Sequence, residues 1–247
     1  MTSFESIDVG DQAHVSQQYA TTDRLRGRMS VWGPGAAGVD PTRVLLEELV
    51  VRSPRTVLEI GCGTGSFARR AVDALPGVDY LATDASPSMV AAARATGVRA
   101  EVRSAEATGQ PAGSIEVVVA AWMLYHVPSL DAALREVRRV LRPDGALLAV
   151  TNGEHHLATL FASAGVTPPR STFTSENGAA LLERHFRHVN RADIDTHATF
   201  PDHASAAAYL ATMDATWAAS LPHFDGARQD SGFTTVFTAT GPRAATR

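Results

Sequence analysis

Short apolar runs alternate with amphipathic segments along residues 41–152. Runs rich in Val, Ile and Leu that stop at Gly or a polar residue are typical of buried parallel strands. Segments that begin at Asp-Pro or Ser-Pro and stop before Gly or Pro are typical of helices. The pattern predicts strands at 56–60, 79–83, 98–103, 115–121 and 146–151, and helices at 41–52, 66–75, 86–96 and 130–141. This alternation predicts βαβ units and a parallel sheet.

The two ends of the chain have a less regular pattern. Residues 1–40 are polar and irregular, with a loop at 33–35. After residue 152 the pattern predicts helices at 176–186 and 204–220 and strands at 189–195 and 233–239. A chain of 247 residues is compatible with one α/β domain. We therefore expect a single domain over 1–247, with an N-terminal lid (1–53), a cofactor-binding core (54–152) and a C-terminal substrate-side part (153–247).

Composition excludes several kinds of chemistry. All 22 basic residues are Arg, so the chain has no lysine for a Schiff base, for pyridoxal phosphate or for a P-loop. A net charge of −4 argues against a nucleic-acid binder, and one cysteine cannot form an internal disulfide. The N-terminus has no signal-peptide pattern, and the longest nearly apolar run, 117–127, is far shorter than the roughly 20 residues of a membrane span. We expect a soluble, cytoplasmic protein.

A glycine-rich loop follows the first predicted strand of the alternating region. Gly61, Gly63 and Gly65 come directly after the strand, and Glu59 lies near its end. Glycines allow a sharp turn and a close approach of the backbone to a ligand. The G-x-G-x-G spacing does not match the G-x-G-x-x-G of dinucleotide-binding proteins. A tight strand–helix turn without a ligand is the alternative, and Cys62 within the loop reads as a small buried residue.

An acidic residue, Asp84, follows the next predicted strand. A carboxylate at this place can accept hydrogen bonds from both hydroxyls of a ribose. The alternative is an acid that only stabilises the N-terminus of the following helix.

These motifs resemble those of the class I methyltransferases that use S-adenosylmethionine (SAM). Acid-x-G-x-G-x-G resembles their first motif, and the text from Met123 to Pro128 and from Leu134 to Gly145 resembles the small-molecule branch, which includes quinone C-methyltransferases and natural-product tailoring enzymes. The resemblance implies an α/β fold: a Rossmann-like, doubly wound, mostly parallel seven-stranded sheet with helices on both faces, N-terminal lid helices and a helical insertion before the last strand. It also implies SAM as cofactor and S-adenosyl-L-homocysteine as product.

The resemblance further assigns residues to the adenosine part of SAM. Ala85 and Met89 follow Asp84 in a segment like that of the family, with Met89 expected near the adenine or else in the core. The family's G-D-A-E segment is here Arg103 to Glu106, so that Ser104 replaces the acid that accepts the adenine amino group. Ser104, Ala105 and Glu106 are therefore expected at the adenine, with weaker recognition.

Candidate acceptor-side residues follow the fourth and fifth strands of the alternating region. Tyr125 and His126 are expected at the carboxyl end of a central strand, where ligands bind in open α/β sheets. His126 is our candidate for a general base or an orienting group, and the alternative is a histidine that only packs. Asn152 either contacts substrate or forms a turn. The Glu154-His155-His156 run does not predict a metal site, since adjacent helical residues point in different directions.

The two termini are expected to close over the site. Tyr19 and Arg28 lie in a segment whose sequence resembles the family's N-terminal helix, where they would contact the methionine end of SAM. Trp32 and Trp217 are candidates for the acceptor wall, together with the insertion 196–232, although aromatic residues more commonly pack in the core.

The leading hypothesis is methyl transfer from SAM to a small organic acceptor, in natural-product biosynthesis, by direct displacement. The alternatives are an RNA methyltransferase on the same fold, a non-catalytic SAM-binding regulatory protein and, disfavoured by the glycine spacing, a nicotinamide-dependent oxidoreductase. We expect no nucleic-acid or membrane partner. The sequence does not distinguish O-, N- or C-methylation, nor a monomer from a homodimer.

Overall fold

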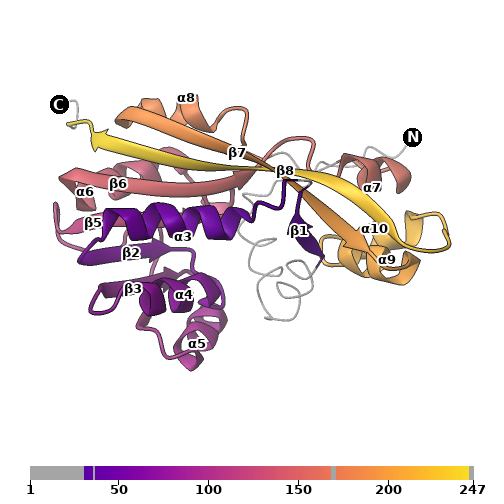
Figure 1. The fold of residues 1–247 in the computed structure, drawn as a ribbon, viewed down its shortest axis with the longest axis horizontal. Helices are drawn as coiled ribbons and strands as arrows, with labels where there is room; N and C mark the ends of the chain where they lie inside the picture. Colours follow the sequence, from indigo (N-terminus) through magenta and orange to yellow (C-terminus); the bar gives the residue numbers. More distant parts are fainter. Residues whose placement is uncertain (1–30, 36, 168–170, 245–247) are drawn as a thin grey trace.

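A single mixed sheet forms the centre of the computed structural model, which describes residues 31–35, 37–167 and 171–244 (Figure 1). Its eight strands are β1 (Trp32–Pro34), β2 (Thr56–Ile60), β3 (Asp79–Asp84), β4 (Ala100–Val102), β5 (Ile115–Ala121), β6 (Leu141–Asn152), β7 (Phe186–Phe200) and β8 (Arg228–Pro242). The helices of the described residues are α3 (Pro41–Arg52), α4 (Ser66–Ala74), α5 (Pro87–Ala95), the short 3-10 helix η1 (Leu124–His126), α6 (Leu130–Val140), α7 (Ala158–Ser163), α8 (Gly178–Glu183), α9 (His203–Ala211) and α10 (Ala215–Ser220).

The strand order is β1-β7-β8-β6-β5-β2-β3-β4. Strands β2 to β6 pair in parallel, whereas β8 pairs antiparallel with both β6 and β7. The predicted fold class is therefore confirmed. The predicted strand count was wrong by one, because Trp32–Pro34 pairs antiparallel with β7 where the sequence predicts a loop.

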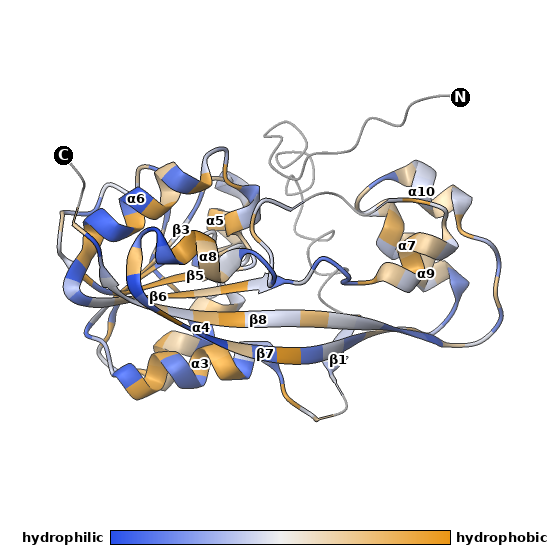
Figure 2. Cartoon of the chain, turned by 90° about the horizontal axis from the view of Figure 1, so that it is seen from above, coloured by the Kyte–Doolittle hydropathy of each residue, from blue (hydrophilic) through white to orange (hydrophobic). Residues whose placement is uncertain are grey.

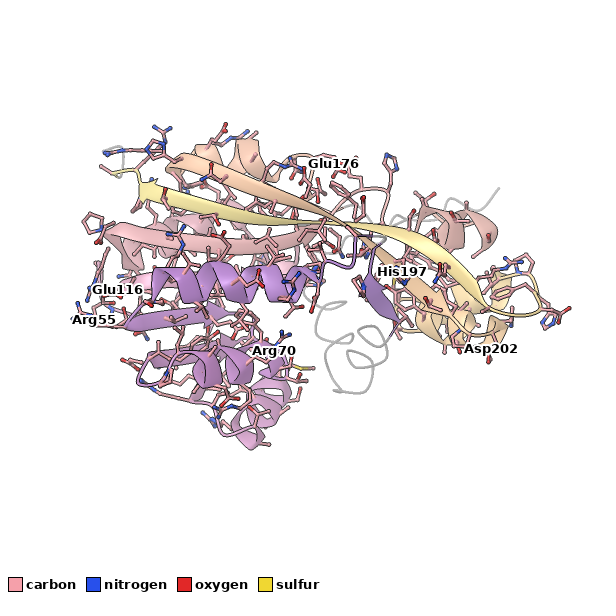
Figure 3. All side chains as sticks on the ribbon, in the orientation of Figure 1. Arg55, Arg70, Glu116, Glu176, His197 and Asp202 are labelled. Atoms are coloured by element: carbon pink, nitrogen blue, oxygen red, sulfur yellow. The ribbon has the colours of Figure 1, made fainter. Side chains whose placement is uncertain are left out.

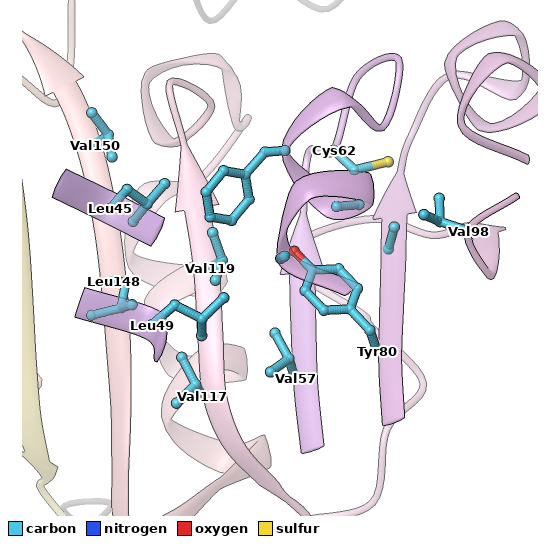
Figure 4. Close-up of a cluster of buried hydrophobic side chains, with 14 of the residues drawn as sticks. Leu45, Leu49, Val57, Cys62, Tyr80, Val98, Val117, Val119, Leu148 and Val150 are labelled. Carbon is cyan, nitrogen blue, oxygen red and sulfur yellow. The ribbon is translucent and has the colours of Figure 1, made fainter. Parts of the chain in front are cut away.

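Helices cover both faces of the sheet and close two hydrophobic clusters. On one face, α3, α4 and α5 pack on the strands, and Figure 4 shows Leu45 and Leu49 of α3 beside Leu148 and Val150 of β6. On the other face, α6 and α8 cover a second cluster. The side chain of Asp40 caps α3 by accepting a hydrogen bond from the Thr42 N–H, as Asp-Pro predicts. This helix thus belongs to the core, although it lies within the segment 1–53 that we expected as a lid.

A long β7–β8 hairpin extends beyond the parallel strands. Both strands have 15 residues, and α7, α9 and α10 gather around the far end of the hairpin (Figures 1 and 2). Their apolar sides form a third hydrophobic cluster with Ala198 and Phe200. The predicted strands 189–195 and 233–239 were therefore too short, and the predicted insertion 196–232 is partly strand.

Three further element boundaries differ from the prediction. The predicted helix 204–220 is two helices, because Asp214 caps α10 by accepting from the Thr216 N–H. Strand β6 starts at Leu141, which pairs with Ile115 before the register resumes at Ala146, and the intervening turn is a bulge within the strand. Strand β4 is three residues long, shorter than the predicted 98–103.

Candidate functional site

The carboxyl ends of the parallel strands bring most predicted site residues to one edge of the sheet. The glycine loop follows β2, Asp84 ends β3, η1 follows β5 and Asn152 ends β6. The opposite, amino edge is marked in Figure 3 by Arg55 and Glu116, whose Nε and Oε1 atoms lie 3.6 Å apart. Ligands of open parallel sheets bind at the carboxyl edge, so this edge is the candidate site.

The glycine loop is a tight turn that uses some of its backbone donors internally. Gly61, Gly63 and Gly65 have φ angles of 66°, 54° and 76°, in the left-handed region that glycine tolerates best. The Cys62 N–H donates to the Thr83 carbonyl at 2.9 Å, and the Gly65 N–H donates to the Cys62 carbonyl at 3.0 Å. The start of α4 has no side-chain cap, so N–H groups of its first turn can face a ligand.

Close packing is a second reason why two of these positions require glycine. A Cβ atom on Gly61 would lie 2.6 Å from the Cβ of Met123, and one on Gly65 would lie 2.8 Å from the Cβ of Ala93 in α5. Gly61 thus lets the segment after β5 lie directly against the loop. Gly65 lets α5 approach the start of α4.

The carboxylate of Asp84 connects the end of β3 to the loop. Its Oδ2 accepts a hydrogen bond from the Gly63 N–H and its Oδ1 accepts one from the Ser86 N–H, both at 2.9 Å. Burial raises the pKa of this carboxyl, and the backbone donors oppose that rise. Each carboxylate oxygen can accept a further hydrogen bond, so the group can still receive ribose hydroxyls.

Glu59 lies beneath the loop and is only 2% exposed. Its Oε2 accepts a hydrogen bond from the Tyr80 hydroxyl at 2.8 Å. Burial raises the pKa of Glu59 to about 8, and the nearby Asp84 carboxylate adds to the rise. Cys62 beside it is buried, and burial also raises the pKa of its thiol, so the loop holds no ready nucleophile.

The predicted adenine side begins where β4 ends. Ser104 and Ala85 are exposed, and Ala105 is partly exposed. The carboxylate of Glu106 accepts a hydrogen bond from the Ser129 N–H at 2.8 Å and so supports the start of α6. Met89 has no exposed surface, because the inner face of α5 buries it. The expectation that Met89 contacts the adenine is therefore wrong, and Met89 is a core residue.

The acceptor side follows β5. Tyr125 and His126 lie in η1, both are partly exposed, and their rings meet edge to face with centroids 4.4 Å apart. The sequence missed Trp122, which directly precedes this segment. Its φ angle of 53° is unusual for a bulky residue. Its indole Nε1–H donates to the Oδ1 of Asn152 at 2.9 Å, so the structure brings the ends of β5 and β6 together.

A second aromatic pair lies beyond Asn152. Trp32 of β1 stacks on His156, with ring centroids 4.1 Å apart and planes inclined by 24°. The Nδ1 of His156 accepts a hydrogen bond from the Phe233 N–H at 3.3 Å, and burial lowers the pKa of this histidine to about 4. The sequence named His156 only as an unconvincing metal ligand, because nothing local shows that Trp32 reaches it.

Comparison with known proteins agrees with this geometry. Residues 58–149, which include the glycine loop, Asp84 and η1, match the family model described as "Methyltransferase domain". The match agrees with the predicted resemblance to class I SAM-dependent methyltransferases. The predicted resemblance is thus confirmed.

The methyltransferase domain has curated relatives of several sizes. The malonyl-[acyl-carrier protein] O-methyltransferase of Methylococcus capsulatus is 31% identical over 175 residues, which are 65% of this chain and 61% of that protein. The reducing polyketide synthase Preu2 of Preussia isomera is 31% identical over 122 residues, 45% of this chain and 5% of that protein. The chain therefore spans less than two thirds of the length of these relatives.

Among solved structures, the crystal structure of the [4+2]-cyclase SpnF has the same fold. Its TM-score is 0.64 at 17% identity, and the alignment covers 97% of this chain and 99% of that one. At this identity the likeness concerns the fold alone.

Three predicted site residues remain. Tyr19 and Arg28 lie outside the described residues. Trp217 is 8% exposed and meets Phe161 edge to face in the third cluster, so its place in the acceptor wall stays a prediction. Within the described part of the chain, no group of three or more His, Cys, Asp or Glu residues is arranged to hold a metal, and no helix is long and apolar enough to span a membrane.

Proposed function

We propose that this protein transfers a methyl group from SAM to a small organic acceptor in natural-product biosynthesis. The observation that carries the proposal is the glycine loop held to the end of β3 by Asp84, within a methyltransferase domain. The turn and the uncapped start of α4 let the backbone approach a ligand closely. The polyketide synthase among the relatives supports a natural-product context.

The residues present fit SAM. The turn at Gly61 and Gly63 allows the backbone to approach the methionine and ribose, and Asp84 offers oxygen acceptors for the ribose hydroxyls. Ser104 and Ala105, which are exposed and partly exposed after β4, would contact the adenine. When bound, SAM supplies a methyl group on a sulfonium, which is itself the electrophile.

The chain's own task is then mainly alignment. Holding an acceptor in line with a reactive carbon can contribute about 7–11 kcal/mol at the highest effective molarities. Tyr125 and His126 lie at the end of β5 and are our candidates for contact with the acceptor. His126 would remove a proton where the acceptor requires it, a contribution of roughly 10²- to 10⁴-fold in rate.

Calorimetric titration tests the cofactor assignment. We expect saturable binding of SAM and S-adenosylhomocysteine and no heat with NAD. Asp84→Asn should weaken binding of S-adenosylhomocysteine roughly ten- to hundredfold, since it removes charge-assisted hydrogen bonds. Asp79→Asn is the matched control, because Asp79 is exposed at the amino end of the same strand. NAD binding, or equal affinities of the two variants, would refute the assignment.

A second candidate is a SAM-binding protein that catalyses another reaction or none, as the fold shared with a [4+2]-cyclase illustrates. Incubation with SAM labelled in its methyl group and a panel of small acceptors separates the two. Labelled product supports methyl transfer. Tight SAM binding with no label on any acceptor of the panel favours the second candidate.

A further inference from the structure

Strand register places several polar and aromatic side chains on one face of the hairpin. Asn152 is opposite Thr234, Thr196 is opposite Gly232, and Trp32 is opposite Ala198. Cross-strand partners point to the same face, and so do residues two apart along a strand. The set, which we call the β8 strip, consists of Trp32, Trp122, Asn152, His156, Thr196, Gly232 and Thr234.

At one end of the strip, hydrogen bonds fix the orientation of the Asn152 amide. Its Oδ1 accepts from the Trp122 indole at 2.9 Å and from the Thr234 hydroxyl at 3.1 Å. An indole nitrogen can only donate, so the atom that it meets must be the amide oxygen. The oxygen is thus used within the protein. The NH₂ group of Asn152 remains as a donor, with no hydrogen bond to the residues that the structure describes.

At the other end, the same reasoning fixes the tautomer of His156. Its Nδ1 accepts the Phe233 N–H, so this nitrogen carries no proton. A neutral imidazole then carries its proton on Nε2 and presents a donor there. Trp32 holds the ring by stacking on it. Gly232 permits this packing, since a Cβ atom there would lie 2.5 Å from Trp32 and 3.1 Å from His156.

A buried hydroxyl lies between these two ends. Thr196 is 8% exposed, and its Oγ1 has no hydrogen-bond partner among the described residues. It lies against Gly232, 2.4 Å from the position of a Cβ atom there. Buried hydroxyls are rarely left unsatisfied in a finished fold, which indicates a missing partner at this place.

The strip also adjoins the cofactor loop. Trp122 is followed by Met123, whose side chain packs directly on Gly61. Trp32, Trp122, Asn152 and His156 are all partly exposed, so a ligand can touch them. The side chains that carry the two donors contact β8 two residues apart, Asn152 at Thr234 and His156 at Gly232.

We propose that the β8 strip binds the methyl acceptor, and that this acceptor is a flat, oxygenated ring system whose oxygen atoms receive hydrogen bonds from the Asn152 amide and from His156 Nε2–H. Indole faces and edges favour contact with planar rings. Donors at two separate positions of the strip suit a fused bicyclic ring with an oxygen at each end. The role of the bound ring as methyl acceptor rests on the proposed function, whereas binding of the ring to the β8 strip does not.

Binding of 2,6-dihydroxynaphthalene to the full-length chain saturated with S-adenosylhomocysteine tests the inference. The matched probe is 2,6-dimethylnaphthalene, which has a similar shape and no oxygen. We expect the dihydroxy probe to bind roughly tenfold more tightly than the dimethyl probe, as measured by quenching of tryptophan fluorescence. It should also shift the ¹⁵N resonance of His156 Nε2.

Two variants with matched controls locate the binding. Asn152→Asp keeps the oxygen that Trp122 and Thr234 require and removes the donor, whereas Asn190→Asp makes the same change at an exposed position of β7. His156→Gln is paired with His155→Gln, since His155 is exposed. We expect the two strip variants to lose roughly tenfold in affinity for the dihydroxy probe and the controls to stay within twofold.

The outcomes separate this inference from the proposed function. Affinity for S-adenosylhomocysteine should be unchanged in all four variants, which also shows that each has folded. Equal binding of the two probes, or equal loss in strip variants and controls, overturns the acceptor site while leaving the SAM assignment intact. Failure of the wild-type chain to bind S-adenosylhomocysteine overturns the proposed function instead.

Discussion

Replacing Glu59 by Gln should remove a large part of the pH dependence of stability. The side chain is 2% exposed, and burial raises its pKa to about 8. In the unfolded chain the same carboxyl titrates near 4.5. Gln has nearly the same shape, and its carbonyl oxygen can still accept the Tyr80 hydroxyl. The substitution therefore removes the titration with little change in packing.

The sign and size follow from proton linkage. Between pH 4.5 and 8 the folded protein keeps a proton on Glu59 that the unfolded chain releases, so stability falls as the pH rises. One proton corresponds to about 1.4 kcal/mol per pH unit. The contribution of Glu59 is thus fully present below pH 4.5, and about 2 to 3 kcal/mol of it is lost between pH 5 and pH 7.

Urea unfolding at pH 5, 6 and 7 and constant ionic strength measures the effect. We expect the difference in unfolding free energy between Glu59→Gln and the wild type to change by about 2 to 3 kcal/mol over this range, in favour of the variant at high pH. Glu183→Gln on the exposed side of α8 is the control. The same pH profile for Glu59→Gln and the wild type would show that Glu59 is ionised in the folded state.

Three other substitutions test the site. Gly61→Ala should cost about 2–5 kcal/mol of stability in urea unfolding, from its positive φ and the contact with Met123, against about 1–2 for Gly77→Ala, which has a positive φ and open space. Tyr80→Phe should cost about 1–3 kcal/mol in the same assay, since it leaves the Glu59 carboxyl without its donor. His126→Ala should keep the affinity for S-adenosylhomocysteine and, for an acceptor that must lose a proton, reduce turnover by roughly 10²- to 10⁴-fold; near-native turnover would exclude a role as base.

The parallel core could be predicted from sequence because its strands are covered on both faces. A strand such as Ile115–Ala121 is therefore apolar except for Glu116 near its start, and the helices of this region begin and end at Pro, Ser and Gly. The β7–β8 hairpin could not be predicted to its full length. Arg187 and His188 near the start of β7 are exposed and polar, so no apolar alternation marks them as strand. Pairing with β8, rather than burial, keeps these residues in a strand.

Site residues in a local sequence motif could likewise be predicted, and those that depend on distant contacts could not. The glycine loop and Asp84 form a local motif within about one βαβ unit, so their spacing predicts them. Trp122 and His156 were missed because their partners come from other elements, Asn152 of β6 for Trp122 and Trp32 of β1 for His156. Met89 was assigned wrongly, since an apolar residue in a short helix looks the same whether it faces a ligand or the core.

Different elements of the fold hold the cofactor loop and the proposed acceptor site. The cofactor loop is held by β2, β3 and α5, whereas the β8 strip is held by the hairpin and β1. The two meet through the packing of Met123 on Gly61. Substitutions along the hairpin can therefore alter the protein groups that donate hydrogen bonds to the methyl acceptor without disturbing the cofactor loop. On this reasoning, Gly232→Ala, which displaces Trp32 and His156, should weaken binding of the flat probe and leave that of S-adenosylhomocysteine unchanged.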